Sequence, residues 1–203
     1  MDKKRHVYVD KNKNGVFDQS EKPLAGIKVS DGLNVVETAA DGSFTLPGHE
    51  RERFIFITTP SGYKTFNRHY HKIEEKQSGY DFGLIPYSGR IRKDGSHRYI
   101  HITDTEIFNT ENHADWVNNV RDYARNEQAA FIIHTGDICY EKGLKAHIKL
   151  MNTENMDCPV FYCIGNHDLV KGKYGEELFE SIYGPVYYSF DAGNVHYIVT
   201  PMP

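Results

Sequence analysis

The sequence predicts a small all-β sandwich followed by an α/β domain that contains the first part of a parallel-sheet core. Three observations carry this prediction. Short β-type runs separated by turn residues fill the first part of the chain, with no helical period between them. Strand-like and helix-like segments alternate in the second part, which is typical of a parallel sheet covered by helices. The length of 203 residues is sufficient for two domains.

The sandwich is expected over residues 1–87. Two Asp-Gly pairs, Asp31-Gly32 and Asp41-Gly42, predict tight hairpin-type turns, because glycine tolerates the positive φ that such turns require. The strand-like segments are rich in branched and aromatic residues and favour an antiparallel arrangement. In order, they are HVYV, GIKVSDG, VVET, ADGSFTLP, RFIFITTP and DFGLIP.

A polar linker over residues 88–97 leads to the α/β domain, expected over residues 98–203. Its first strand, YIHITD, precedes apolar residues at helical spacing over residues 114–124. The next segments predict a strand, a helix and a strand: AAFIIHTGD, GLKAHIKLMN and PVFYCIGNHD. The final segment, VYYSFDAGNVHYIV, predicts a hairpin at the edge of the parallel sheet.

Composition excludes several classes of protein. The formal net charge is −4 and the two signs are interspersed, which argues against bulk binding to nucleic acid or to an anionic membrane. No run of about 18 apolar residues occurs, so a membrane-spanning helix is not expected. The basic start lacks an apolar stretch behind it, so no signal peptide is predicted. The three cysteines, Cys139, Cys158 and Cys163, are expected to be buried free thiols.

Polar residues stand where three successive strands of the predicted parallel sheet end. They are Asp104 and Glu106, then Asp137, then Asn166, His167 and Asp168. Carboxyl ends of parallel strands meet at one edge of a sheet, so these side chains are expected to lie close together. Oxygen donors beside an imidazole suit divalent or trivalent metal ions. Two such ions about 3.5–4 Å apart can activate water and hold a phosphoryl group during in-line displacement. The plainer interpretation is a set of helix-capping and turn residues.

Two short motifs extend this argument. The Gly-Asp pair 136–137 and the Gly-Asn-His-Asp block 165–168 together resemble signature blocks of the calcineurin-like metallophosphoesterase superfamily, relatives of the purple acid phosphatases. The resemblance covers residues 98–203. It implies a metal-dependent hydrolase that acts on phosphomonoesters or phosphodiesters through two ions of Mn, Fe, Mg or Zn.

By this resemblance, Asp104 binds the first metal and Asp137 bridges both. Asn166 binds the second metal and orients phosphate, while His167 protonates the leaving oxygen. Glu106 stands where the family usually has a histidine, so a carboxylate replaces an imidazole as the ligand. Tyr140 stands where purple acid phosphatases place an iron-binding tyrosine, and it is equally interpreted as a packing residue.

The resemblance also implies later ligands, an isolated histidine and a GHxH block, which residues up to Pro203 do not contain. The site is therefore expected to be incomplete and the chain to be a piece of a longer enzyme. The alternative hypothesis is a catalytically silent, calcium-stabilised surface or binding module, and a further one is a purely structural remnant.

A second ion site is predicted in the first domain. Residues 10–21, DKNKNGVFDQSE, match the twelve-residue calcium loop at every ligand position, with Gly15 at the turn. The alternative is a hairpin turn without an ion. The region resembles calcium-stabilised β-sandwich repeats of bacterial surface proteins and the module that precedes some Bacteroidota phosphoesterases, which implies export. The predicted ligands are Asp10, Asn12, Asn14, the Val16 carbonyl, Asp18 and Glu21.

The remaining histidines are not predicted as ligands. His134 and His101 are interpreted as core or rim residues beside the strand ends. His69 and His71, two apart on an extended stretch, could hold a metal or simply face water. Four others have no convergent partner in the sequence: His49, His97, His113 and His147.

Overall fold

The computed structural model describes residues 3–66, 68–75, 77, 79–87, 90–138 and 140–201. Cys139 and the first two linker positions, Ser88 and Gly89, therefore lie outside the described residues. The chain forms two compact units. One comprises Met1–Gly89 with Tyr188–Ile198, and the other comprises Arg90–Tyr187 with Val199–Pro203.

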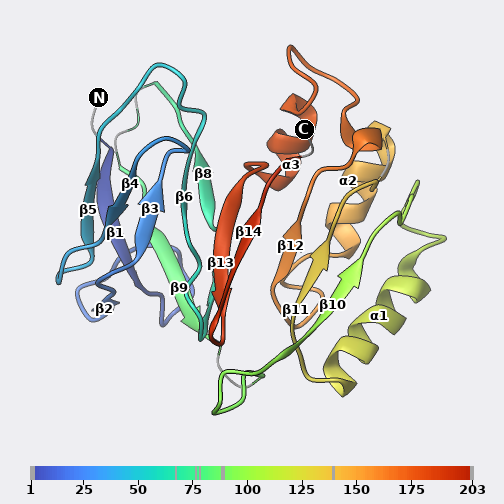
Figure 1. Ribbon diagram of the computed structural model, residues 1–203, viewed down its shortest axis with the longest axis horizontal. Helices are drawn as coiled ribbons and strands as arrows, with labels where there is room; N and C mark the ends of the chain where they lie inside the picture. Colours follow the sequence, from blue (N-terminus) through green and yellow to red (C-terminus); the bar gives the residue numbers. More distant parts are fainter. Residues whose placement is uncertain are drawn as a thin grey trace. The chain divides into compact units, whose positions relative to one another are not determined.

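The first unit contains two sheets that share one apolar core, so the predicted all-β sandwich is confirmed (Figure 1). One sheet has the order β2-β1-β9-β7, with β5 paired to β1, and the other has the order β4-β3-β6-β8. The strands are β1 Lys3–Val9, β2 Lys22–Pro23, β3 Lys28–Ser30, β4 Val35–Glu37, β5 Ser43–Leu46, β6 Phe54–Ile57, β7 Tyr63–Thr65, β8 Tyr70–Lys72 and β9 Phe82–Pro86.

One strand pair departs from the expected antiparallel arrangement. Strands β1 and β9 are parallel, with Val7 opposite Phe82 and Val9 opposite Leu84. A parallel pair requires a long connection, and here the remaining strands of the sandwich lie between its members in the chain. Local sequence patterns do not reveal such pairing.

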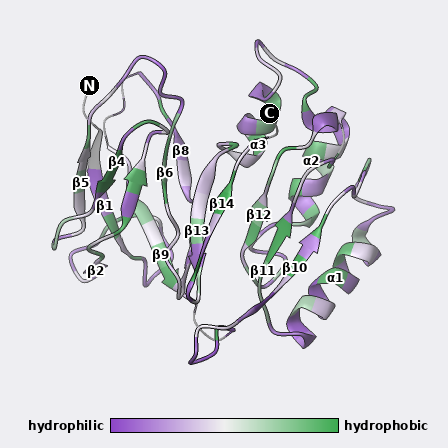
Figure 2. Ribbon diagram, viewed as in Figure 1, coloured by the Kyte–Doolittle hydropathy of each residue, from purple (hydrophilic) through white to green (hydrophobic). Residues whose placement is uncertain are grey.

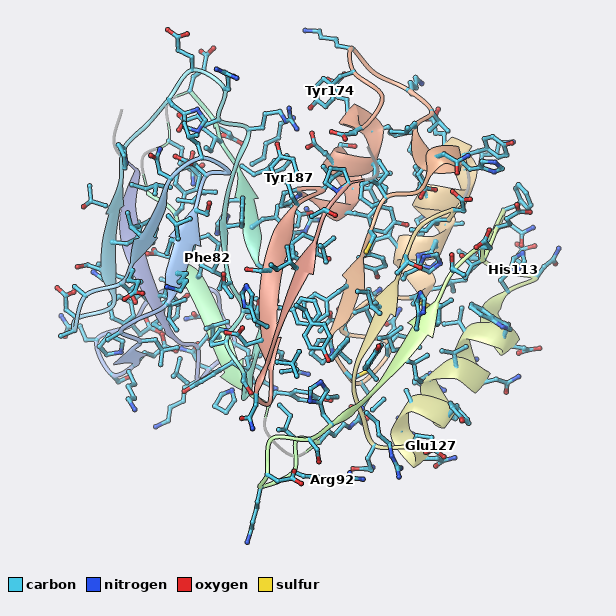
Figure 3. The ribbon with its side chains drawn as sticks, in the orientation of Figure 1. Phe82, Arg92, His113, Glu127, Tyr174 and Tyr187 are labelled. Atoms are coloured by element: carbon cyan, nitrogen blue, oxygen red, sulfur yellow. The ribbon has the colours of Figure 1, made fainter. Side chains whose placement is uncertain are left out.

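The core of the sandwich draws side chains from both sheets. Val7, Leu46, Ile55 and Leu84 are fully buried, and Phe82 is 1% exposed and lies inside the sandwich (Figure 3). Burying one such side chain contributes roughly 1.5–3 kcal/mol to the transfer free energy. The first unit therefore has its own hydrophobic core.

Both Asp-Gly pairs form tight turns, as predicted. Gly32 has φ +92° in the turn that joins the antiparallel strands β3 and β4, and Gly42 has φ +75°. The second turn does not close a hairpin, however, because β5 pairs with β1 in the opposite sheet instead of with β4. The chain therefore crosses between the two sheets at Gly42.

The predicted C-terminal hairpin exists but is not at the edge of the parallel sheet. Strands β13 Tyr188–Ala192 and β14 Val195–Val199 form a separate two-stranded sheet. Within the first unit, the backbone N–H of Asp191 donates to the Thr59 carbonyl at 2.8 Å. The alternating apolar residues of β13 correctly indicated a strand, but they could not indicate which sheet receives it.

The second unit contains the predicted parallel sheet, in the order β10-β11-β12, whose arrowheads point the same way in Figure 1. Its strands are β10 Arg98–Ile102, β11 Ala129–His134 and β12 Val160–Tyr162. Its helices are α1 Ala114–Asn126, α2 Tyr140–Leu150 and α3 Glu177–Tyr183, together with the short 3₁₀ helix η1 Asn166–Asp168. Helix α2 begins three residues earlier than predicted, while α3 and η1 were not predicted.

Hydropathy explains how the elements of the second unit pack. Strand β11 is almost wholly hydrophobic, as a strand covered on both faces should be, while α1 is mixed (Figure 2). On α1, Val117 and Ala124 are buried, but Tyr123 is 60% exposed although it follows the apolar spacing. Within the part of the chain that the structure describes, no helix has the length and apolar character needed to cross a bilayer.

The crossing at Gly42 generates a stability prediction. A Cβ on Gly42 would lie 2.6 Å from the Val7 carbonyl oxygen and 2.9 Å from Pro23 Cβ. Gly42→Ala should therefore lower the free energy of unfolding by ~1–2 kcal/mol for its left-handed backbone and by ~1–3 kcal/mol more for overpacking. Urea unfolding followed by circular dichroism measures the change.

Gly26→Ala is the matched control, because Gly26 has φ +72° but no atom of the described residues within 4 Å of an added Cβ. The free energy of unfolding of Gly26→Ala should fall only by the cost of the left-handed backbone, without the cost of overpacking. Equal losses in the two variants would contradict the close approach at Gly42.

Candidate metal centre

The three loops that follow β10, β11 and β12 are joined by backbone hydrogen bonds at one edge of the parallel sheet. The N–H of Thr135 donates to the Ile102 carbonyl at 2.9 Å, and the N–H of Asp104 donates to the Gly136 carbonyl at 3.2 Å. The N–H of Cys163 donates to the His134 carbonyl at 2.7 Å. The three strand ends that sequence analysis singled out are therefore neighbours in space.

Asp137 links the second loop to the third. Its Oδ1 accepts the backbone N–H of His167 at 3.1 Å. The two loops approach so closely that a Cβ on Gly136 would lie 2.6 Å from Gly165 Cα. A Cβ on Gly165 would in turn overlap the backbone nitrogen and Oδ1 of Asp137. Both glycines of the two sequence motifs are thus required by this contact.

The block 165–168 divides into a structural part and an exposed part. Asp168 was expected at the rim with the other strand-end residues, but it is fully buried, because its Oδ2 accepts the N–H of Gly165 at 2.9 Å and closes the η1 turn. Asn166 and His167, on the same turn, are exposed. The two residues predicted to act on phosphate are therefore presented to solvent by a buried carboxylate.

Tyr140 lies beside His167 at the start of α2. The two rings are stacked, with centroids 6.0 Å apart and an interplanar angle of 24°. Tyr140 is 53% exposed, so the packing expected of it takes place at the rim, where its ring lies beside that of His167.

Unusual backbone conformations are concentrated here. Asp104, Glu106, Asp137 and Tyr140 have φ values of +52°, +43°, +53° and +45°. They are half of the eight described residues other than glycine that have positive φ. Such a conformation costs roughly 1–2 kcal/mol per residue, and residues that carry this strain cluster at functional sites.

The carboxylates retain acceptor capacity that the protein does not use. Asp104 Oδ2 accepts the Thr103 hydroxyl at 2.6 Å, and Asp137 Oδ1 accepts the His167 N–H. Within the described residues, the second oxygen of each carboxylate has no hydrogen-bond partner, and Glu106 has no hydrogen bond or ion pair to the other candidate ligands. Asp104, Glu106 and Asp137 do not form a group of three whose carboxylate oxygens all lie within 4.8 Å of one another.

A buried histidine lies beneath these loops. His134 is fully buried, and burial lowers its pKa to about 4 despite the opposing negative charges of Asp104 and Asp137. The centroid of its ring lies 4.9 Å from that of the His147 ring, and burial also lowers the pKa of His147. His134 is thus a satisfied core histidine, as interpreted from the sequence. His101, by contrast, is an exposed residue bonded to the Thr135 hydroxyl at 2.7 Å.

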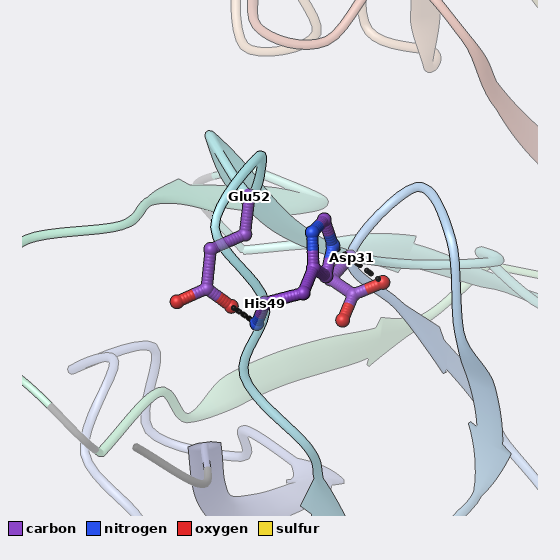
Figure 4. A group of neighbouring side chains, drawn as sticks. All are labelled: Asp31, His49 and Glu52. Atoms are coloured by element: carbon purple, nitrogen blue, oxygen red, sulfur yellow. Dashed lines mark hydrogen bonds and ion pairs between the residues drawn. The ribbon is translucent and has the colours of Figure 1, made fainter.

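A separate group in the first unit could hold a metal ion. Asp31, His49 and Glu52 offer ligand atoms within 4.8 Å of one another, so the expectation that His49 lacks convergent partners was wrong (Figure 4). His49 Nε2 lies 3.4 Å from Asp31 Oδ1. The same oxygen already accepts the N–H groups of Leu33 and Asn34 in the β3–β4 turn, and these bonds lower the pKa of Asp31 against the effect of burial.

Sequence patterns did not predict this group because its members come from two separate loops. Asp31 was recognised only as a turn residue, and His49 and Glu52 lie in the connection between β5 and β6. Glu52 Oε2 accepts the backbone N–H of His49 at 3.3 Å (Figure 4). These hydrogen bonds to backbone N–H groups give the carboxylates of Asp31 and Glu52 a structural role.

The predicted calcium loop is closed by its two end carboxylates. Asp10 and Glu21 are 1% and 6% exposed. Asp10 accepts the N–H groups of Asn14 and Gly15 at 3.1 and 2.9 Å. Glu21 accepts those of Lys11 and Asp18 at 2.8 and 3.1 Å.

Other side chains of the same loop also converge. Asp18 Oδ2 accepts the amides of Asn12 and Asn14 at 2.7 and 3.0 Å. Val16, whose carbonyl is the remaining predicted ligand, donates its N–H to Asn14 Oδ1 at 2.8 Å. The six predicted ligand residues therefore belong to one hydrogen-bonded loop.

The described cysteines and the pair His69 and His71 agree only in part with the predictions from the sequence. Cys158 is buried, as expected, whereas Cys163 is only half-buried, and burial raises the pKa of its thiol to about 11. His69 does not simply face water: burial, with a smaller effect from Arg68, lowers its pKa to about 4. His71 Nε2 lies 2.8 Å from the Asp81 carbonyl oxygen.

Comparison with known families covers both units. Residues 97–199 match the family described as calcineurin-like phosphoesterase. Residues 11–86 match the family described as the N terminal of calcineurin-like phosphoesterase. Among curated proteins, no sequence matches the chain.

The contact between Gly165 and Asp137 can be tested through stability. Gly165 has φ −104°, which any residue adopts, so only the steric overlap penalises a larger side chain. Gly165→Ala should lower the free energy of unfolding of the second unit by ~1–3 kcal/mol. Trp116, the single tryptophan, lies on α1 and reports urea unfolding of this unit by fluorescence.

Gly175→Ala is the control for the same measurement. The nearest atom to an added Cβ there is Leu169 Cδ2 at 3.2 Å, the end of a side chain that can move. A loss at Gly175 as large as that at Gly165 would argue against the close packing of the two loops.

Proposed function

Because the chain belongs to the calcineurin-like phosphoesterase family, we propose that it hydrolyses phosphate monoesters or diesters at a centre of two metal ions. Asp104, Asp137 and Asn166 are the proposed ligands, with Glu106 as a further one. The observation that carries the proposal is the meeting of the three loops at one sheet edge, where each aspartate keeps one carboxylate oxygen without a partner among the described residues.

The donor chemistry fits metal ions of the proposed kind. Carboxylate and amide oxygens suit Mn, Mg or Fe, and the replacement of an imidazole by Glu106 makes the ligand set harder than one that favours Zn. When bound, two such ions supply Lewis acidity for the phosphoryl group and acidify the attacking water. The strained backbones of Asp104, Glu106 and Asp137 support this assignment, since strain of this kind accumulates where function requires it.

The protein residues have separate tasks in the proposed reaction. Asp137 holds η1 through the His167 N–H and so sets the position of both exposed residues of the turn. Asn166 orients the phosphate through its amide. His167 donates a proton to the leaving oxygen as the phosphorus–oxygen bond breaks, and the stacked ring of Tyr140 restricts its orientation.

Activity tests the proposal directly. With added Mn²⁺, the protein should hydrolyse p-nitrophenyl phosphate, bis(p-nitrophenyl) phosphate or both. Asp137→Asn should reduce kcat/KM by at least ~100-fold, since it removes a charge that holds the metal ions while keeping the size of the side chain. Release of p-nitrophenolate gives the rate.

Asp122→Asn, an exposed change on α1, is the control and should leave the rate unchanged. Equal rates for the wild type and Asp137→Asn would remove the enzyme proposal. They would favour the alternative hypothesis of a catalytically silent module.

We also propose that residues 10–21 bind Ca²⁺. Two buried carboxylates, Asp10 and Glu21, stand with Asp18 in one small loop. The crowding of negative charge is visible at Tyr8, whose pKa is raised by burial and then by the charge of Asp10 and other nearby carboxylates. A cation would relieve this repulsion. With three carboxylates, the expected affinity is ~10⁻⁴ to 10⁻³ M, as in extracellular modules.

Thermal unfolding tests the calcium proposal. Ca²⁺ at 100 times its Kd should stabilise the protein by ~2.7 kcal/mol, seen as a rise in Tm. Glu21→Gln should abolish the rise, while Asp41→Asn, at an exposed turn outside the loop, should retain it. A Ca²⁺-induced rise of the same size in all three proteins, or in none, would contradict a site in this loop.

A further inference from the structure

One buried side chain is bonded to two of the three loops of the candidate metal centre. His134 is the last residue of β11 and is fully buried. Its Nδ1 accepts the backbone N–H of Gly136 at 3.2 Å, and its Nε2 lies 2.9 Å from Thr105 Oγ1. Gly136 belongs to the loop after β11, whereas Thr105 belongs to the loop after β10.

The direction of both hydrogen bonds follows from their partners. A backbone N–H can only donate, so Nδ1 of His134 carries no proton. The neutral ring then carries its proton on Nε2 and donates it to the Thr105 hydroxyl. A buried imidazole with both nitrogens engaged has one orientation, because ring rotation would break both bonds.

The two partners are adjacent in sequence to the proposed ligands. Thr105 stands between Asp104 and Glu106, and Gly136 immediately precedes Asp137. All three carboxylate residues have left-handed backbones, which persist only where their surroundings hold them. The hydrogen bond from the Asp104 N–H to the Gly136 carbonyl is a second direct link between these loops.

We propose that His134 is a positioning residue that links the Asp104–Glu106 loop to the Asp137 loop and sets the distance between their carboxylates. This role rests on the proposed function, because it matters for catalysis only if those carboxylates hold metal ions. His134 itself does not touch the metal ions or the substrate. It acts through Thr105 and Gly136, as partners of ligand residues do in other metal sites.

The neighbouring His147 provides a matched control. It is equally buried, and its ring packs edge-to-face on that of His134 with centroids 4.9 Å apart. Its Nδ1 lies 3.3 Å from the Tyr183 hydroxyl, and its Nε2 has no hydrogen-bond partner in the described part of the chain. Replacing it therefore disturbs the same core without removing a bond to either loop.

Two substitutions of His134 separate its two hydrogen bonds. In His134→Asn the amide oxygen can take the place of Nδ1 and keep the acceptor for the Gly136 N–H. In His134→Gln the longer amide can take the place of Nε2 and keep the donor to Thr105. His134→Leu removes both, and Thr105→Val removes the hydroxyl acceptor at nearly constant shape.

The first experiment measures Mn²⁺ binding by calorimetry and the steady-state hydrolysis of p-nitrophenyl phosphate. His134→Leu should weaken Mn²⁺ affinity by ~10–100-fold and lower kcat with little change in KM, since substrate contacts are untouched. His134→Gln should retain more Mn²⁺ affinity and a higher kcat than His134→Leu. This advantage should disappear when His134→Gln is combined with Thr105→Val. His147→Leu should retain wild-type affinity and kcat in conditions where urea unfolding, followed by Trp116 fluorescence, finds each variant folded.

The second experiment does not depend on activity. Amide hydrogen exchange at Gly136 should be faster in His134→Gln than in His134→Asn, because only asparagine retains the acceptor. Unchanged Mn²⁺ affinity in His134→Leu, or an equal loss in His147→Leu, would overturn the positioning role. If the wild type binds no Mn²⁺, the proposed function fails. Amide exchange at Gly136 then tests the link through His134 by itself: a difference in rate between His134→Gln and His134→Asn supports the link, and equal rates overturn it.

Discussion

The close approach of the loops that follow β11 and β12 is the constraint on which the candidate centre depends. Gly136 and Gly165 meet so closely that neither can carry a side chain without displacing its neighbour. This contact allows Asp137 to accept the His167 N–H, and thereby places a carboxylate from one loop beside the exposed turn of the next. The parallel register of the strands brings the loops to one edge, and the absence of two Cβ atoms lets them touch.

The strained backbones are understandable in this context. Left-handed conformations at Asp104, Glu106 and Asp137 oppose folding by a few kcal/mol in total. The buried strand β11, which ends at His134, and the buried Asp168 of η1 hold the loops in place against this cost. Loops with relaxed backbones could turn their carboxylates toward solvent independently, whereas rigid packing beneath the loops limits the positions that each carboxylate can take.

Local patterns in the sequence were sufficient to predict the structural class of each unit. They also predicted where the parallel strands of the second unit end. The Asp-Gly turns, the alternation of strands with helices and the two glycine motifs each have a physical cause within a few residues. The parallel pairing of β1 with β9, the place of β13, and the group formed by Asp31 and His49 depend on contacts between distant residues. His134 shows the same limit: its strand was predictable, but its bond to Thr105 spans 29 positions.

Burial and hydrogen bonding separate two kinds of carboxylate in this chain. Asp168 is fully buried and binds a backbone N–H, as does Asp31, which is 6% exposed; both hold turns. Asp104 and Asp137 are more exposed, and each keeps an oxygen without a protein partner in the described structure. At the candidate metal centre a cation gains most from the second kind, because their unused lone pairs can bind it without breaking bonds that hold the fold. This distinction explains why the final aspartate of the 165–168 block supports the site from within, while the asparagine and histidine before it face solvent.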